Sequence, residues 1–230
     1  MGIYIEALAL YIVLFLSGFV ASTGNMPPKT EVFSILAEVY KIVLYIIPSL
    51  ALIWYLIIRG KLAYPIPTQV SGKSSSVNLG LKPEKKDVIS TFIALPCLIF
   101  VGFAITFLAS RTEEPASQIY LHSPNSVWGW IVLCLSIFLS AYLEESFFRY
   151  YFLTRKNEFN LSSVNIIVFS TTLFSICHIY EGHWGFLNSV ISAVILAIIF
   201  LRYQSLHGIA IAHGLYNIAA YAINTIINKG

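Results

Sequence analysis

The amino-acid sequence predicts an all-α fold, a polytopic membrane helix bundle of about seven transmembrane helices. Of the 230 residues, 57% are apolar and 11% are charged, whereas about 25% of the residues in an ordinary soluble domain are charged. The mean hydropathy is +0.77. Several apolar stretches approach or exceed the ~20 residues that a helix needs to cross a ~30 Å hydrocarbon layer. Together these observations disfavour a soluble domain with a large buried core.

We expect seven helices, each in its own apolar stretch. The first carries Glu6 and lacks a basic leading region, so we interpret it as a retained span rather than a cleaved signal peptide. Pro48 and Pro96 fall inside the second and third helices, where contacts with neighbouring helices let a membrane protein tolerate a kink. The expected ranges are 4–22, 38–58, 88–109, 127–153, 163–180, 186–203 and 205–226.

The longest expected loop, residues 59–87, predicts the orientation of the chain. It is rich in Pro, Gly and Ser, which favours flexibility, and by the positive-inside rule its basic residues make it cytoplasmic. Counting outward puts the N-terminus and the loop 154–162 inside, and the C-terminus and the loop with Glu113 and Glu114 outside. A bacterial inner membrane fits this compact chain. The basic residues of the loop are Arg59, Lys61, Lys73, Lys82, Lys85 and Lys86.

Charge and cysteine content add little about partners. The formal net charge of +3 is too small to suggest nucleic acid, and the basic residues lie in loops rather than in one patch. Cys97, Cys134 and Cys177 all lie in apolar stretches, where we expect them to pack as small apolar residues. The predicted partners are therefore the lipid bilayer and a membrane-embedded or membrane-anchored substrate.

The fourth expected helix contains the first candidate site, Glu144, Glu145 and Arg149. An ionisable residue near the centre of a span costs ~2.5–3.5 kcal/mol on insertion scales, so each is a functional candidate. Glu145 and Arg149 are four residues apart and share a helix face, whereas Glu144 points about 100° away. Arg149 can therefore neutralise Glu145 and leave Glu144 free as a general base or acid. The alternative is a charge network that only locks helices together.

Two further helices carry polar pairs with the same four-residue spacing. Phe174 and His178 share one face of the fifth helix, so the aromatic ring can wall the site in which His178 works. His213 and Asn217 share one face of the seventh, where both can donate hydrogen bonds to an oxyanion. The alternatives are an interfacial histidine in the first case and polar contacts that hold helices together in the second.

Depth along the helices partly supports one common site. At ~1.5 Å rise per residue, Glu144 lies about 13 Å and His213 about 12 Å above the inner ends of their expected helices. By the same count His178 lies about 22 Å up, higher than the other two. A lower start of its helix or a tilt would be needed to bring it level.

In this order, the motifs EExxxR (Glu144, Glu145, Arg149), FxxxH (Phe174, His178) and HxxxN (His213, Asn217) resemble the signature of the CPBP family. This family, also called Abi, comprises CAAX proteases and bacteriocin-processing enzymes, and the resemblance covers about residues 127–226. It divides the chain into N-terminal helices, 1–126, and a protease core, 127–230. It implies a peptidase that cuts within or near the membrane.

The resemblance also implies a role for each residue of the motifs. Glu144 would activate water with His178 as its assisting base, while His213 and Asn217 would hold the oxyanion. Glu145 and Arg149 would order the site. The substrate stays open between a prenylated C-terminal tail, a bacteriocin leader and a C-terminal sorting signal.

Metal dependence is a second open question. Two histidines and a carboxylate could bind zinc and leave a position open for water, with Glu144, His178 and His213 as the ligands. Adjacent carboxylates on a helix point in different directions, however, and Asn217 is a better oxyanion donor than zinc ligand. We therefore favour a glutamate mechanism without a cofactor, with zinc as the alternative.

Other functional classes lack their usual marks. The sequence has no H-E-x-x-H motif, no G-x-S-x-G-like element, and a single aspartate, Asp87, which we expect in the cytoplasmic loop. A proton-coupled transporter could use the same ionisable residues, but no inverted repeat is visible. A catalytically inactive immunity or binding relative is the remaining alternative, although the candidate residues are all present.

Overall fold

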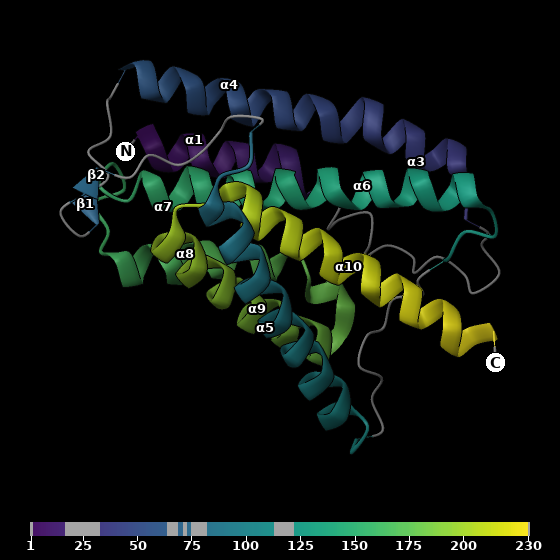
Figure 1. Cartoon of the computed structure of the whole chain (residues 1–230). Coiled ribbons are helices and arrows are strands. Elements are labelled where there is room, and N and C mark those ends of the chain that lie inside the picture. The colour runs from purple at the N-terminus through teal and green to yellow at the C-terminus, as the bar shows by residue number, and fades with distance from the viewer. Residues whose placement is uncertain are drawn as a thin grey trace.

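The computed structural model describes residues 2–16, 33–63, 69–70, 73–74, 82–112 and 122–229, and its architecture confirms the predicted all-α bundle (Figure 1). The only strands among these residues form a two-residue antiparallel hairpin, β1 (Gln69–Val70) and β2 (Lys73–Ser74). The helices are α1 (Gly2–Tyr11), α3 (Ile35–Lys41), α4 (Ile47–Ala63), α5 (Lys85–Ala109), α6 (Val127–Glu145), α7 (Phe152–Thr154), α8 (Ser163–Ile176), α9 (Gly182–Tyr203) and α10 (Leu206–Lys229).

Short π-helical turns interrupt or extend three of these helices. They are η1 (Ile12–Leu16) after α1, η2 (Ile42–Ile46) between α3 and α4, and η3 (Ser146–Tyr151) between α6 and α7. Pro48 follows η2 closely, and a proline can neither donate to the carbonyl four residues earlier nor tolerate it at normal distance. The wider π turn accommodates this local disruption, so α3, η2 and α4 continue as one helix.

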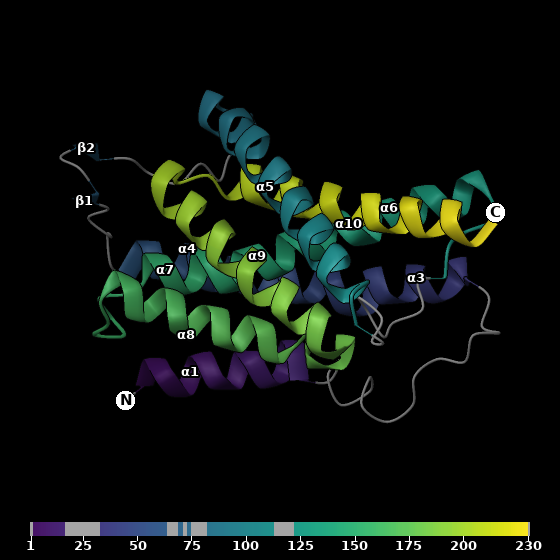
Figure 2. The same cartoon turned by 90° about the horizontal axis from the view of Figure 1, so that it is seen from below.

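The helix segments correspond to the seven predicted helices, and successive segments run in alternating directions (Figures 1 and 2). Within the described residues four are long and apolar enough to cross a membrane: Ile35–Arg59, Lys85–Ala109, Val127–Thr154 and Ile179–Tyr203. Two apolar helices, Gly2–Phe15 and Ser163–Ile176, are shorter. The chain therefore has the helices of an integral membrane protein.

The predicted boundaries are wrong at the turn between α8 and α9. The fifth helix was expected to reach residue 180, but α8 ends at Ile176. A single 3₁₀ turn, η4 (Ile179–Glu181), follows, and α9 begins at Gly182 rather than at residue 186. Gly182 has φ 84°, in the left-handed region that favours glycine. This residue lets the chain reverse within a few residues.

Aromatic side chains fill the core around η3. Phe147, Phe148, Phe152 and Phe159 are fully buried. Phe15 of η1 packs against Phe147 and Phe148, with ring centroids 5.1 and 4.8 Å away. Such contacts combine large apolar burial with a preference for tilted and edge-on geometry. The core therefore connects the N-terminal helix to the segment that carries the candidate site.

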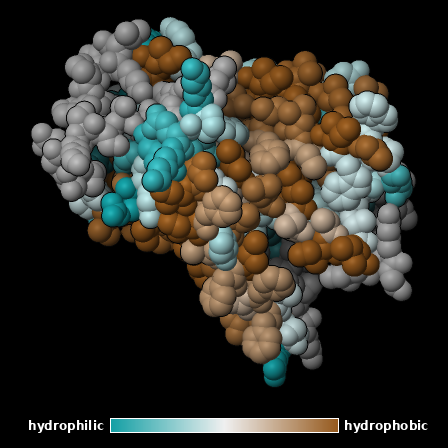
Figure 3. Space-filling view, viewed as in Figure 1, coloured by the Kyte–Doolittle hydropathy of each residue, from teal (hydrophilic) through white to brown (hydrophobic). Residues whose placement is uncertain are grey.

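The outer surface is largely apolar, as Figure 3 shows for one face. Helix α5 exposes Phe92, Phe100, Phe103 and Phe107, each more than half exposed. Exposed apolar patches of this extent are rare on soluble monomers. They fit a chain whose solvent is lipid.

The loop predicted at residues 59–87 is shorter than expected. Helix α4 extends to Ala63 and α5 begins at Lys85, so basic residues assigned to the loop belong to helix ends. Asp87 lies in the first turn of α5 and is 2% exposed, which corrects its expected place in the loop. The reason is a capping box with Glu84, whose backbone N–H donates to Asp87 Oδ2 at 2.8 Å.

Asp87 also fixes α5 against the start of α10. The Ser205 hydroxyl donates to Asp87 Oδ1 at 2.6 Å, and Thr91 Oγ1 donates to the Gly208 carbonyl at 3.1 Å. The two helices approach so closely that a Cβ on Gly208 would lie 1.8 Å from Ser90 Oγ. Only glycine permits this contact.

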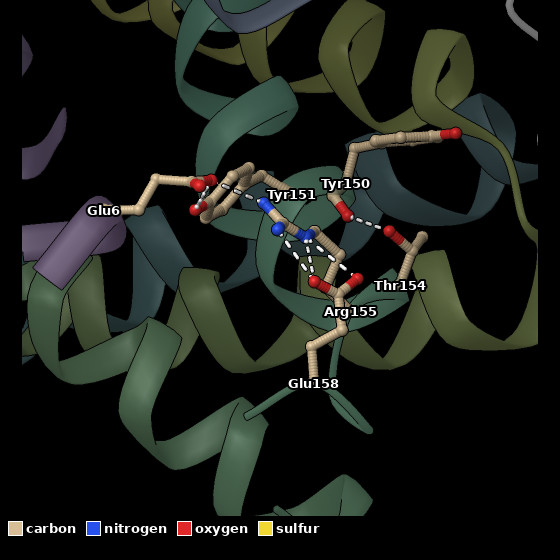
Figure 4. A network of polar contacts seen from close by, with 6 residues as sticks. All are labelled: Glu6, Tyr150, Tyr151, Thr154, Arg155 and Glu158. Atoms are coloured by element: carbon tan, nitrogen blue, oxygen red, sulfur yellow. Dashed lines mark hydrogen bonds and ion pairs between the residues drawn. The ribbon is translucent and has the colours of Figure 1, made fainter. Parts of the chain in front are cut away.

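A polar network at the far end of η3 ties α1 to the loop after α7 (Figure 4). Glu6 accepts hydrogen bonds from Tyr151 Oη at 2.7 Å and from Arg155 Nη1 at 2.8 Å. Arg155 Nη2 also pairs with Glu158 at 2.8 Å. Burial alone would lower the pKa of Arg155, but its hydrogen bonds to Glu158 and Glu6 outweigh burial and raise that pKa.

Several expectations fall outside the described residues. These are the end of the first helix beyond residue 16, most of the loop between α4 and α5, and the loop with Glu113 and Glu114. Which side of the bilayer faces the cytoplasm therefore stays a prediction.

We predict that Gly208→Ala destabilises the fold. Its Cβ would overlap Ser90 Oγ and lie 2.6 Å from the Asp87 carbonyl oxygen, and overpacking of this kind costs about 1–3 kcal/mol. The melting temperature in detergent should fall by several degrees. Gly2→Ala is the matched control, because no atom lies within 4 Å of a Cβ at Gly2. Equal melting temperatures for both variants would contradict the tight crossing of α5 and α10.

Candidate active site

The local structure of the candidate site begins with the π turn η3, which directly follows Glu145. In a π helix one residue is inserted into the regular repeat, and such turns occur frequently at functional sites. The Ser170 hydroxyl on α8 donates a hydrogen bond to the Phe148 carbonyl, and buried aromatic rings surround the turn. Contacts from neighbouring elements therefore stabilise a backbone shape that the helix repeat alone would not favour.

Glu145 is the centre of a buried charged cluster. Its side chain is fully buried, and its Oε1 lies 3.1 Å from Arg149 Nη1 and 2.8 Å from His213 Nδ1. A carboxylate oxygen can only accept, so Nδ1 is the protonated nitrogen of His213. The predicted pair of Glu145 with Arg149 thus also includes His213 of α10.

Glu144 lies beside this cluster and not within it. Its side chain is 24% exposed, and its Oε2 lies 3.8 Å from Nε2 of His213. The two nitrogens of His213 consequently face two different carboxylates. Glu145 holds the ring by a hydrogen bond, while Glu144 has no such partner within the described residues and keeps access to solvent.

The Phe174 ring forms one wall of the site and contacts Arg149, His178 and His213. Arg149 lies over its ring at 4.4 Å, a cation–π contact. The ring of His178 is tilted against it with centroids 4.4 Å apart, and the ring of His213 meets it edge-on at 6.2 Å. A single aromatic side chain on α8 thereby contacts residues from three parts of the site.

His178 follows the end of α8, and its ring packs against Phe174. Its Nδ1 is 2.9 Å from the Phe174 carbonyl oxygen, and since a carbonyl only accepts, Nδ1 is the donor. Helix α8 begins at Ser163, where the fifth helix was expected to begin, and the contact with Phe174 nevertheless brings His178 to the other site residues. The structure brings together Glu144, Glu145, Arg149, Phe174, His178 and His213.

Asn217 is not joined to that group by a hydrogen bond within the described residues. It lies one turn after His213 on the continuous helix α10 and is half-buried. Its side chain makes no hydrogen bond to any residue in the described ranges. The amide is therefore free of a structural partner there.

The sequence interpretation missed Glu181. Its Oε1 lies 3.9 Å from Nε2 of His178, and both side chains are about one-fifth exposed, at 22% and 20%. The available signal was a carboxylate three residues after a candidate histidine, at the start of an apolar stretch. An acidic residue at a helix start is common for other reasons, which is why it did not stand out.

The positions of the possible ligand atoms bear on whether this site could bind zinc. Across the described part of the chain, no three His, Cys, Asp or Glu side chains are grouped so that they could hold a metal ion. Nδ1 of His213 is occupied by Glu145 and Nδ1 of His178 by a backbone carbonyl, so Nε2 is the nitrogen that each ring could offer to a metal. The alternative ligand set of Glu144, His178 and His213 does not form a three-ligand site in this arrangement.

Comparison with known proteins identifies a family for this region. Residues 124–219 match the model of the family described as "Type II CAAX prenyl endopeptidase Rce1-like". No curated protein and no solved structure matches the chain. The match contains all three motifs and confirms the resemblance to the CPBP family over that part of the chain.

We predict that Glu145→Gln destabilises the folded protein and Glu144→Gln does not. Loss of the Glu145 charge strands Arg149, which is 1% exposed, and breaking a buried ion pair costs ~3–5 kcal/mol. Thermal unfolding in detergent should show a clear loss for Glu145→Gln only. Similar melting temperatures for both variants would mean that Glu145 does not hold the cluster together.

Proposed function

We propose that this chain, which is Rce1-like over residues 124–219, is an intramembrane endopeptidase. It hydrolyses a peptide bond in a membrane-associated protein or peptide. The observation that best supports the proposal is the division between two adjacent carboxylates. Glu145 is buried and pairs with both Arg149 and His213. Glu144 is partly exposed, and its Oε2 lies 3.8 Å from His213 Nε2.

In the proposed mechanism Glu144 acts as the general base. It takes a proton from water, and the water oxygen attacks the carbonyl carbon of the scissile peptide bond. The tetrahedral intermediate then collapses, the C–N bond breaks, and the leaving amine takes a proton returned by Glu144 or supplied by His178. Proton transfer by positioned side chains of this kind contributes typically ~10²–10⁴-fold to the rate.

His213 is proposed to stabilise the oxyanion together with Asn217. Because Nδ1 of His213 donates to Glu145, its Nε2 can donate only when the ring is protonated. Glu144 and Glu145 flank the ring and would stabilise that positive charge. The half-buried Asn217 amide supplies a second donor on the same helix face.

Three substrate classes agree with this site: a prenylated C-terminal tail, a peptide leader and a C-terminal sorting signal. The description of the matched family favours the first. All three would reach the site from the bilayer, because helices α6, α8 and α10 around it expose apolar side chains. We place the protein in a bacterial inner membrane with its N-terminus in the cytoplasm, following the charge of the loop between α4 and α5.

We predict that Glu144→Gln abolishes cleavage in a folded protein. Removing the general base leaves water unactivated, while the helix bundle keeps its contacts. The assay would use purified protein in proteoliposomes with three probes: a farnesylated C-terminal peptide, a Gly-Gly leader peptide and a membrane-anchored sorting tail. Mass spectrometry would identify the products.

Near wild-type turnover by Glu144→Gln would reject Glu144 as the base. No cleavage of any probe by folded wild-type protein would favour an inactive relative. Proton flux across the same liposomes without cleavage would favour a transporter.

We further predict that chelation leaves the activity unchanged. A glutamate mechanism needs no cofactor, so dialysis against a strong chelator should preserve turnover, and elemental analysis should find far less than one zinc per chain. Stoichiometric zinc, with activity lost on its removal and restored on its return, would establish the metal alternative.

Asn217 provides a test of the oxyanion role. If its amide acts only in the transition state, Asn217→Ala should lower kcat by about 10²–10³-fold with little change in KM. Asn217→Asp should be at least as damaging, because it brings a negative charge close to the developing oxyanion. A large loss of melting temperature with unchanged kcat would instead assign Asn217 to helix packing.

A further inference from the structure

The turn between α8 and α9 has a structure that helix packing alone does not require. His178 follows the end of α8, Glu181 ends the 3₁₀ turn, and Gly182 starts α9 with a positive φ of 84°. The chain reverses within these few residues. His178 is thus held by a turn and not by a helix, and its ring orientation depends on side-chain and backbone contacts nearby.

Two contacts define most of that orientation. The ring lies against Phe174, with centroids 4.4 Å apart, and Nδ1 donates to the Phe174 carbonyl oxygen at 2.9 Å. Nε2 is therefore the only nitrogen left for chemistry. A flip of the imidazole ring would exchange the positions of Nδ1 and Nε2, so that Nε2 would no longer face the site.

Glu181 is the charged group next to this nitrogen. Its Oε1 lies 3.9 Å from Nε2, too far for a direct hydrogen bond and within range of a charge interaction. The carboxylate therefore faces the same site as the proposed catalytic residues.

Gly185 allows Glu181 to occupy this position. A Cβ on Gly185 would lie 2.4 Å from Glu181 Cβ and 3.0 Å from Glu181 Oε2. Contacts below 3.0 Å force a neighbour to move, and here the neighbour is the base of the Glu181 side chain as well as its carboxylate. The absence of a side chain at Gly185 thus lets the Glu181 carboxylate fold back over the first turn of α9.

We propose that Glu181 is a positioning residue that acts through His178. Its charge attracts the ring when Nε2 is protonated, as it must be to supply the proton to the leaving amine, while the Phe174 carbonyl holds Nδ1 on the other side of the ring. The proposal rests on the function proposed above, in which His178 assists proton transfer. The competing explanation is a structural one, in which the carboxylate only stabilises the N-terminus of α9.

The experiment compares kcat, KM and melting temperature in Glu181→Gln, Glu181→Asp and Gly185→Ala. We expect Glu181→Gln to lower kcat about 10–100-fold, as small misplacements of a catalytic group do, with little change in KM or melting temperature. Glu181→Asp keeps the charge and should recover part of the loss. Gly185→Ala should reproduce part of it, because it displaces the carboxylate without removing it.

Glu158→Gln is the matched control. Glu158 lies in the turn after α7 and also pairs with a neighbouring side chain, Arg155. It belongs to the network of Figure 4, whose members include none of the proposed catalytic residues. Its kcat should equal that of the wild type.

A double-mutant cycle with His178→Ala distinguishes the outcomes. If Glu181 acts through His178, Glu181→Gln has no further effect on kcat once His178 is replaced. Fully additive losses, or a loss of melting temperature with normal kcat, would overturn the proposal. An unchanged kcat in His178→Ala would instead refute the role of His178 in the proposed function. If His178→Ala has no measurable turnover, the kcat of Glu181→Gln and its recovery in Glu181→Asp decide the matter.

Discussion

The buried Glu145 carboxylate connects most of what is described above, because one of its oxygens faces both Arg149 and His213. A charge in an apolar bundle is costly unless it is paired, so α6 and α10 must meet at this point. Arg149 in turn lies over Phe174 and thereby fixes the level of α8. The pairing is incomplete, since Glu145 Oε2 and Arg149 Nη2 are buried without a hydrogen-bond partner among the described residues. Unsatisfied buried groups of this kind are expected where an arrangement serves chemistry more than stability.

The sequence was sufficient to predict the helices and the contacts between side chains four residues apart, because both depend on local spacing. Glu145 and Arg149 lie four residues apart and meet as helix geometry requires. Phe174 and His178 have the same spacing and meet across the end of α8. The contact of His213 with Glu145 depends on how α10 packs against α6, and no local pattern encodes that. The end of α8 was missed because Cys177 and Ile179 continue an apolar stretch, whereas the turn depends on the backbone of Gly182. Asp87 was assigned to a loop because its burial depends on Ser205, far away in the sequence.

The π turns show why local periodicity was an incomplete guide. A hydroxyl of Tyr45 in η2 donates to the Leu14 carbonyl in η1, and Ser170 of α8 does the same for the Phe148 carbonyl in η3. In each case a side chain from another helix satisfies a backbone group in the widened turn. The helices α1, α4, α6 and α8 are therefore connected through backbone carbonyls as well as through apolar packing. Such contacts restrict how far these helices can move relative to one another.

The length of α8 has a consequence for what this protein encounters in a bilayer. Its 14 residues extend for about 21 Å, shorter than the ~30 Å hydrocarbon layer. With the other end of α8 at one membrane surface, the turn with His178 and Glu181 would lie below the opposite surface, where lipid must thin or give way to water. In the proposed function, a peptide bond would become accessible there according to its depth in the bilayer. The thickness of the surrounding membrane would then determine which bond of a substrate reaches the site. A change in lipid chain length would therefore shift the position of the cut.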